Sequence, residues 1–211
     1  MSAFSEFVDR IQQQLQQPLP GMAAQQKMAS SLRKNHHWQF KDEQAARQAA
    51  TLLLLYEKPD GIYTALMQRT KDGYAHGGQI SFPGGRKDPN DVDHFATALR
   101  ETEEEFGVPR EAIQVLGKLT DLYVPASNNL IFPVVGCLHT EAIFFPNKAE
   151  VEQVIEVPLS YLQQPNIVKQ TVLRPYLDLD LDVPYFDVYG HIVWGATAML
   201  LGEFLEVIEQ M

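Results

Sequence analysis

The sequence predicts an α/β fold in which a mixed sheet lies between helices, as an α/β/α sandwich. Two observations indicate this class. Short apolar runs typical of β-strands recur between residues 49 and 188, and helical patterns stand at the start, in mid-sequence and at the end. At 211 residues the chain suits a single main domain with a substantial core. We expect a helical extension over residues 1–40 and the main domain over residues 41–211.

The first elements follow from apolar spacing and turn signals. Residues 4–17 form an amphipathic pattern with apolar side chains at helical spacing, and residues 23–32 predict a further helical turn or two. Residues 49–56 and 62–68 are β-like, and the Asp-Gly pair between them is a strong hairpin signal. The basic cluster at residues 33–37 is interpreted as an exposed loop rather than a phosphate contact.

Later elements alternate between short strands and one terminal helix. Strands are expected at residues 80–82, 113–119, 130–138, 153–157, 167–173 and 185–188. The loop at residues 123–129 is expected to border a pocket. The last helix, residues 194–208, carries Trp194, Ala198 and Leu201 on one stripe, for which we expect core packing rather than stacking on a base.

An acidic cluster stands at the end of the mid-sequence helix, which Gly107 is expected to stop. Acids in a last turn face the negative end of the helix dipole, which costs about 0.3–1 kcal/mol each. Glu101, Glu104 and Glu105 are also spaced to repel one another, and no Lys lies between residues 91 and 109. A hard divalent cation, Mg²⁺ or Mn²⁺, would relieve this repulsion. The alternative is a solvated acidic helix face.

The helical period assigns opposite faces to the two kinds of side chain. At about 100° per residue, the three glutamates lie on one side and are expected to point outward, while Glu103 is expected to be solvated. The other side is the predicted buried stripe: Phe95, Leu99, Thr102 and Phe106.

The segment from Gly85 through Arg100 to Val108 resembles the Nudix box, a Gly, an acid-containing loop and then R-E-U-x-E-E-x-G-U, where U is apolar. The second half is complete except for Thr102 at the first apolar position. One extra residue separates Gly85 from Arg100, and Asp91 stands about where the loop acid belongs. The resemblance implies the Nudix-type α/β/α sandwich with a mixed sheet.

The residues before the box resemble a subgroup of this family, the coenzyme A pyrophosphatases. The shared segment is H-x-G-Q-I-x-F-P-G-G at residues 76–85, preceded by Arg69 and Thr70, and residues 97–101 read T-A-L-R-E. The chain departs from the subgroup at residues 73–74, where Gly-Tyr replaces the usual Leu-Arg. The missing Arg would be a phosphate contact, so the resemblance defines the substrate less well than it defines the family.

The resemblance also implies roles for the residues of the box. Glu101, Glu104 and Glu105 would be metal ligands for Mg²⁺ or Mn²⁺, with the backbone carbonyl of Gly84 as a further ligand. Arg100 would orient a glutamate through a charge-assisted hydrogen bond.

The general base and the substrate contacts stay open at this stage. Glu105, Glu104 or Glu150 could be the base, and the alternative for Glu150 is a loop acid or helix cap. We expect substrate contacts by Arg69, His76 and Gly85, although His76 could instead cap the glycine-rich turn. Ser127 could donate a hydrogen bond to substrate or serve turn chemistry.

The expected activity is metal-dependent hydrolysis of a diphosphate linkage in a nucleoside diphosphate derivative, with coenzyme A or a relative as the leading substrate. ADP-ribose, NADH or another nucleotide is the alternative within the class. A catalytically silent nucleotide sensor is the alternative from another class. Selectivity among nucleotides depends on loops outside the box.

Composition excludes several other functions. A formal net charge of −10 argues against binding a nucleic-acid backbone, and no apolar stretch is long enough to span a membrane. The first residues lack a signal-peptide pattern, so we expect a cytoplasmic location. Cys137 lies in an apolar run and is expected to be buried. A homodimer is possible, but no feature of the sequence demands one.

Overall fold

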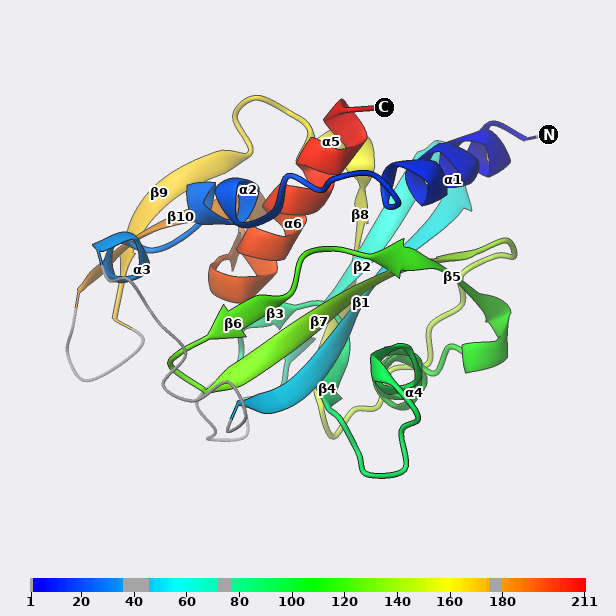
Figure 1. Cartoon of the computed structure of the whole chain (residues 1–211), viewed down its shortest axis with the longest axis horizontal. Coiled ribbons are helices and arrows are strands. Elements are labelled where there is room, and N and C mark those ends of the chain that lie inside the picture. The colour runs from blue at the N-terminus through cyan, green and yellow to red at the C-terminus, as the bar shows by residue number, and fades with distance from the viewer. Residues whose placement is uncertain (1, 36–45, 72–76, 175–179) are drawn as a thin grey trace.

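The computed structural model of the protein describes residues 2–35, 46–71, 77–174 and 180–211. It contains a large mixed sheet with helices on both faces (Figure 1). The strands of this sheet are β1 (Arg47–Lys58), β2 (Gly61–Arg69), β3 (Ile80–Ser81), β4 (Gly84–Arg86), β5 (Ile113–Lys118), β6 (Leu122–Val124), β7 (Asn129–Leu138) and β8 (Val151–Pro158).

Strand β1 organises the sheet because it pairs with three other strands. It is antiparallel to β2 and β4 and parallel to β7, which makes the sheet mixed, as predicted. Lys58 pairs with Gly61, so only two residues form the turn of the β1–β2 hairpin, and the hairpin prediction is confirmed. Strand β6, which pairs with β7, was not predicted and takes part of the expected loop at residues 123–129.

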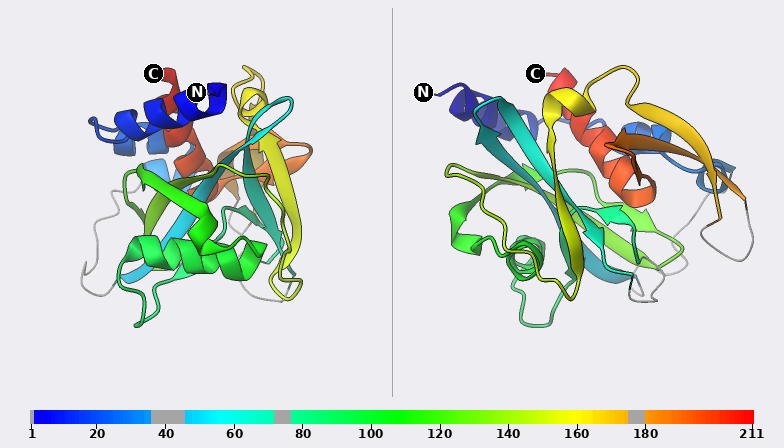
Figure 2. Two further views of the ribbon diagram at one scale, coloured as in Figure 1. Left: turned by 90° about the vertical axis from the view of Figure 1, so that its right-hand side faces the viewer. Right: turned by 180° about the vertical axis from the view of Figure 1, so that it is seen from behind.

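The centre of β1 is buried on both faces. Leu52 and Leu54 belong to one core, and Leu53 and Leu55 belong to the other. A continuous apolar run is typical of a strand covered on both sides. Helix α4 (His94–Phe106) covers one face, and α1 (Ala3–Gln14) with α6 (Gly195–Glu209) covers the other (Figure 2). The predicted sandwich is confirmed.

The N-terminal helices pack onto the α6 side of the sheet. Phe4, Val8 and Ile11 of α1 are buried there, as the amphipathic pattern predicts, and the helix ends three residues earlier than expected. Helices α2 (Gly21–Lys27) and α3 (Ser31–Asn35) follow. The described part of residues 1–40 therefore shares a core with the last helix.

One fully buried carboxylate fastens α2 to α6. Glu203 of α6 has no exposed surface, and it accepts a hydrogen bond of 2.8 Å from Nε2 of Gln25. Its other oxygen accepts one of 3.1 Å from the backbone N–H of Thr120. Buried charge is tolerated where its lone pairs are satisfied in this way.

A second, smaller sheet lies beside α6. The strands expected at residues 167–173 and 185–188 are confirmed as β9 (Val168–Leu173) and β10 (Leu181–Val188), after the short helix α5 (Leu159–Leu162). They form their own sheet together with β11 (His191–Val193), which the sequence did not predict. A short 3₁₀ helix, Arg110–Ala112, links α4 to β5.

Two further expectations concern the burial of Cys137 and helices that could span a membrane. Cys137 has no exposed surface, as predicted, and burial raises the pKa of its thiol to about 11. In the described ranges, no helix is both long and apolar enough to cross a membrane.

Candidate active site

Strand β4 and the end of α4 form the part of the site that the acidic cluster occupies. A Cβ added at Gly84 would lie 2.3 Å from the backbone oxygen of Ala50, and the φ of Gly84 is 153°. A Cβ added at Gly85 would lie 2.4 Å from the carboxylate of Glu101. Two adjacent glycines therefore allow β4 to contact β1 on one side and the acidic helix on the other.

Helix α4 is capped at both ends, and its predicted stop at Gly107 is confirmed. Asp93 caps the start by accepting a 2.8 Å hydrogen bond from the N–H of Ala96. Gly107 ends the helix with a φ of 69°, in the left-handed conformation. Thr102, which stands where the Nudix box has an apolar residue, is fully buried and donates a 2.7 Å hydrogen bond to the carbonyl of Ala98. Threonine can occupy this buried position because a backbone carbonyl of the same helix accepts a hydrogen bond from its hydroxyl.

Glu105 points inward, so its predicted outward orientation is wrong. Its residue is 1% exposed, and its carboxylate accepts 2.7 Å from the N–H of Gly84 and 3.3 Å from Nη1 of Arg69. Burial raises the pKa of Glu105 to about 8, the Gly84 N–H and Arg69 oppose this shift, and the charges of Glu101 and Glu150 add to it. The orientation expected from the helical period is wrong because β4 also covers a side of α4.

The predicted buried stripe is also only partly correct. Phe106 and Thr102 are buried, but Phe95 is 37% exposed and Leu99 is half-buried. Burial is centred on Thr97, Ala98, Thr102, Glu105 and Phe106 instead.

Arg100 connects the remaining acids. It binds both oxygens of Asp91 at 3.0 Å, Oε1 of Glu101 at 2.9 Å and Oε2 of Glu104 at 3.0 Å. Its Nη2 also donates to the carbonyl of Arg86 on β4, at 3.0 Å. One guanidinium thus holds α4 to the loop and strand before it.

The two other glutamates of the box differ in exposure. Burial raises the pKa of Glu101, Arg100 opposes this shift, and the charges of Glu104 and Glu150 add to it. The side chain of Glu104 is 52% exposed. Glu103, expected to be solvated, instead forms an ion pair with Arg110.

Glu150 lies on the same side of the molecule as the acidic cluster. Its carboxylate accepts a 3.2 Å hydrogen bond from the side-chain amide of Asn147, and its backbone carbonyl accepts 2.9 Å from the N–H of Thr70. Its charge contributes to the raised pKa of both Glu101 and Glu105. The chain thus places a fourth carboxylate within electrostatic reach of the box.

A cavity of about 580 Å³ opens beside the two glycines. Its wall includes Gly84, Gly85, Arg69 and Ser127, so three of the four predicted substrate contacts, Arg69, Gly85 and Ser127, line one space. The fourth, His76, lies outside the described residues, as do Gly73 and Tyr74. The segment at residues 124–127 borders the cavity, as expected for this loop.

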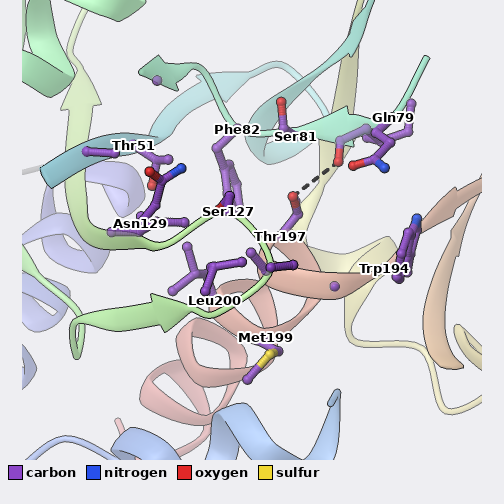
Figure 3. Close-up of a pocket in the computed structure, with 18 of the residues that line it drawn as sticks. Thr51, Gln79, Ser81, Phe82, Ser127, Asn129, Trp194, Thr197, Met199 and Leu200 are labelled. Carbon is purple, nitrogen blue, oxygen red and sulfur yellow. Dashed lines mark hydrogen bonds between the residues drawn. The ribbon is translucent and has the colours of Figure 1, made fainter. Parts of the chain in front are cut away.

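Much of the remaining wall was not foreseen from the sequence. Phe82 and the first turns of α6 supply an apolar surface, and Figure 3 shows Trp194, Met199 and Leu200 around the opening. Thr197 joins α6 to the strand before the glycines through a 3.1 Å hydrogen bond to the carbonyl of Ile80. Trp194, expected in the core, is half-buried and lines the cavity. In the sequence, the only sign that this region lines a cavity was that an aromatic residue, Trp194, stands just before the helix.

The charge of the cavity wall is opposite to that of the chain. Arg33, Arg69 and Arg86 line it, and none of its described lining residues is Asp or Glu, although the chain has 27 acids and 17 bases. The cavity is therefore suited to an anionic ligand.

The acidic cluster fits a divalent cation by its chemistry. Glu105 is buried and Glu101 is half-buried, burial raises the pKa of both, and carboxylate oxygens are the ligands that Mg²⁺ and Mn²⁺ prefer. Among the described residues, no three acidic, His or Cys side chains are placed so that they could hold a metal ion in these directions. Arg100, Gly84 and Arg69 hold the carboxylates in their present directions.

The mixed sheet between helices, the double-glycine strand and the acidic helix together define a Nudix protein. A NUDIX domain profile matches residues 46–174, and the chain belongs to this family of hydrolases.

Two relatives and one solved structure agree with this assignment. The chain is 32% identical to the uncharacterized Nudix hydrolase NudL of Photorhabdus laumondii, over 99% of this chain and 100% of that one. It is also 32% identical to the NudL of Yersinia pestis, over 93% and 90% of the two chains. A crystal structure of the Nudix hydrolase RenU of M. smegmatis has the same fold, with a TM-score of 0.53 and 17% identity over 79% of this chain and 88% of that one.

Proposed function

We propose that the protein hydrolyses a diphosphate linkage in a nucleoside diphosphate derivative, with coenzyme A or a relative as its substrate. One observation carries the proposal: the two glycines that contact the carboxylates of Glu101 and Glu105 also line an arginine-bearing cavity free of acids among its described residues. Phosphates held in this cavity would lie next to the acidic cluster.

Glu101, Glu104 and Glu105 would hold Mg²⁺ or Mn²⁺, together with the carbonyl of Gly84. When bound, such a cation polarises the phosphoryl oxygens and acidifies a water molecule. Arg100 fixes the directions of Glu101 and Glu104 through its ion pairs. Arg69 has one hydrogen bond to Glu105 and borders the cavity, so it is placed to bind a phosphate oxygen as well.

Hydrolysis adds one water molecule across the diphosphate. The water oxygen bonds to one phosphorus, the bond from that phosphorus to the bridging oxygen breaks, and a base accepts the proton of the water. Glu104 and Glu150 are exposed carboxylates near the cluster and are the candidates for this base. Glu105 is buried and is better suited to ligation than to proton transfer with solvent.

The size and lining of the cavity also support a small-molecule substrate with both charged and apolar parts. Its volume of about 580 Å³ lies within the range of roughly 300–1,000 Å³ usual for small-molecule sites. Its wall combines arginines with Phe82, Trp194 and Met199. A ligand that joins phosphates to an apolar or amide-containing arm matches both surfaces.

The test is a panel of coenzyme A, ADP-ribose, NADH and dinucleoside polyphosphates, each incubated with Mg²⁺ or Mn²⁺ and analysed by chromatography. We expect coenzyme A to yield adenosine 3′,5′-bisphosphate and 4′-phosphopantetheine. Glu105→Gln should lower kcat/KM by about 10²–10⁴-fold, because the lost carboxylate is one of the proposed ligands. Glu103→Gln, which changes only the Arg110 ion pair, is the matched control.

Two other outcomes would redirect the proposal. Faster turnover of ADP-ribose or NADH than of coenzyme A would keep the chemistry and replace the substrate. The absence of any product would favour a silent nucleotide sensor, a reading consistent with the position of Nη1 of Arg100, which occupies the point where Glu101 and Glu104 meet.

A further inference from the structure

We propose that Arg33 forms a second anion-binding position in the cavity, which holds a negatively charged group of the substrate far from the scissile diphosphate. The inference rests on the proposed hydrolysis, because it assigns the diphosphate to the end of the cavity at Gly84 and Gly85. It adds a specificity-determining residue from the N-terminal helices, outside the matched domain at residues 46–174.

Arg33 is a half-buried cation that has no acidic partner among the described residues. It lies on α3 and lines the cavity, and its Nη2 donates a 2.7 Å hydrogen bond to the backbone carbonyl of Tyr123 on β6. Within the part of the chain that the structure describes, no carboxylate forms an ion pair with it. Burial is the cause of its lowered pKa. A guanidinium carries five N–H donors, and a neutral carbonyl does not balance its charge.

The position of Arg33 separates it from the hydrolytic end. The strands between the two ends run in the order β4, β1, β7 and β6, so three strand spacings separate Gly84 from Tyr123. At about 4.8 Å per spacing, this corresponds to roughly 14 Å. The phosphates that bind beside the glycines and Arg69 cannot also reach Arg33.

This separation decides which substrate group fits. In coenzyme A the ribose phosphate is joined to the diphosphate by only about six bonds, so it stays within roughly 8 Å. The pantetheine arm has about 13 bonds from phosphorus to sulfur and spans roughly 16 Å when extended. An acid group attached at the sulfur would therefore reach Arg33, and the apolar wall of Phe82, Met199 and Leu200 would accommodate the arm. The class of substrate that fits is a coenzyme A thioester of a dicarboxylic acid.

The experiment compares matched substrates that differ by one negatively charged group. Succinyl-CoA and acetyl-CoA differ by a carboxymethyl group at the end of the arm, and coenzyme A and 3′-dephospho-CoA differ by the ribose phosphate. We expect the wild type to have at least tenfold higher kcat/KM for succinyl-CoA than for acetyl-CoA. Arg33→Gln should reduce this ratio to about one, with little change for acetyl-CoA. Lys34→Gln removes the same charge from an exposed neighbour on α3 and should leave the ratio unchanged.

Each result has a defined meaning. If the ribose phosphate, and not the acyl carboxylate, depends on Arg33, then the assigned separation from the diphosphate is wrong and the proposal is overturned. If Arg33→Gln lowers kcat/KM equally for all four substrates, or if the wild type does not discriminate within either pair, the proposal is overturned. Arg33→Lys, which keeps the charge, should retain part of the discrimination even if the Gln variant folds poorly.

A binding measurement separates this inference from the proposed activity. Calorimetric titration of the Glu105→Gln protein with succinyl-CoA and acetyl-CoA, and of the double variant with Arg33→Gln, requires no turnover. If charge-dependent binding at Arg33 is present but no substrate is hydrolysed by wild type, the proposed function fails and the anion position remains. If wild type hydrolyses a substrate but Arg33→Gln has no effect on binding, the proposed function stands and the anion position at Arg33 fails.

Discussion

At the scale of single residues, Gly84 and Gly85 are adjacent but resist substitution for different reasons. A side chain at Gly84 would collide with the backbone of β1, whereas one at Gly85 would collide with the end of the Glu101 side chain. Backbone of a paired strand cannot move without breaking the sheet, while a carboxylate can rotate. The first position therefore controls folding and the second controls the acidic cluster.

Alanine substitutions should separate these two effects. We expect Gly84→Ala to lower the free energy of unfolding by about 2–4 kcal/mol, because both its φ and its contact with Ala50 oppose a Cβ. Gly85→Ala should change stability by about 1 kcal/mol or less but lower kcat/KM by 100-fold or more, because it displaces Glu101. Urea denaturation and the hydrolysis assay measure the two quantities. Equal stability losses in the two variants would contradict the distinction.

Residue patterns predicted which acids gather but not how each one points. The spacing of Glu101, Glu104 and Glu105 indicates a cluster, and the absence of a nearby Lys predicts that the repulsion among them is uncompensated. The structure shows that Arg100, already within the motif, binds two of them. Glu105 turns toward Gly84, and the tertiary contact that holds it there joins residues 21 positions apart. The spacing of residues along a helix does not show which of them a distant segment of the chain will contact.

At the scale of elements, α4 is attached to the loop before it by the Asp91–Arg100 pair. Both carboxylate oxygens of Asp91 are engaged, and the side chain is only 7% exposed. The hydrogen bonds from Arg100 hold the pKa of Asp91 well below its ordinary range. Because the folded pKa lies below the unfolded value of about 4, this stabilisation is complete above that pH and declines as the pH falls below it.

Asp91→Asn should therefore destabilise the protein in a pH-dependent way. We expect a loss of about 1–3 kcal/mol at pH 7, the usual value of hydrogen bonds to charged groups, and a smaller difference from wild type at pH 3. Glu111→Gln, at an exposed position after the same helix, should have an effect below about 0.5 kcal/mol. Urea denaturation at both pH values is the measurement. A difference that grows toward pH 3 would contradict the assigned role.

Elements differed in how well their sequences predicted them. Long periodic segments such as α1, β1 and α6 were located correctly, because each has enough apolar residues to define a period. Strands β6 and β11 have three residues each and depend on pairing with β7 and β10 rather than on their own pattern. The cavity wall at Trp194 and Met199 depends in turn on how α6 docks, which no local pattern specifies.

At the scale of the whole molecule, the N-terminal helices are joined to the last helix by the buried Glu203. Its two hydrogen bonds reach Gln25 on α2 and Thr120 after β5, so one side chain connects three distant parts of the chain. Helix α3, which carries Arg33, follows α2 directly. Stability of this junction should therefore influence the far end of the cavity.

Glu203→Ala tests this junction. We expect it to lower the free energy of unfolding by about 2–4 kcal/mol, since it removes the buried acceptor of the Thr120 N–H and leaves the Gln25 amide with only the carbonyl of Thr120. Glu206→Gln, which alters only an exposed ion pair with Lys27, should cost less than about 1 kcal/mol. Chemical denaturation measures both. A loss below about 1 kcal/mol for Glu203→Ala would show that the junction does not depend on this carboxylate.

The pairing of α1 with α6 has a consequence during synthesis. Gln14 forms a 3.1 Å hydrogen bond with Gln210, a residue 196 positions later. At a ribosomal rate of about 5–20 residues per second, the first helix waits for roughly 10–40 s before the α6 part of its docking surface exists. During that interval Phe4, Val8 and Ile11 are available to chaperones, and the newborn polypeptide can complete their burial only after α6 has been synthesised.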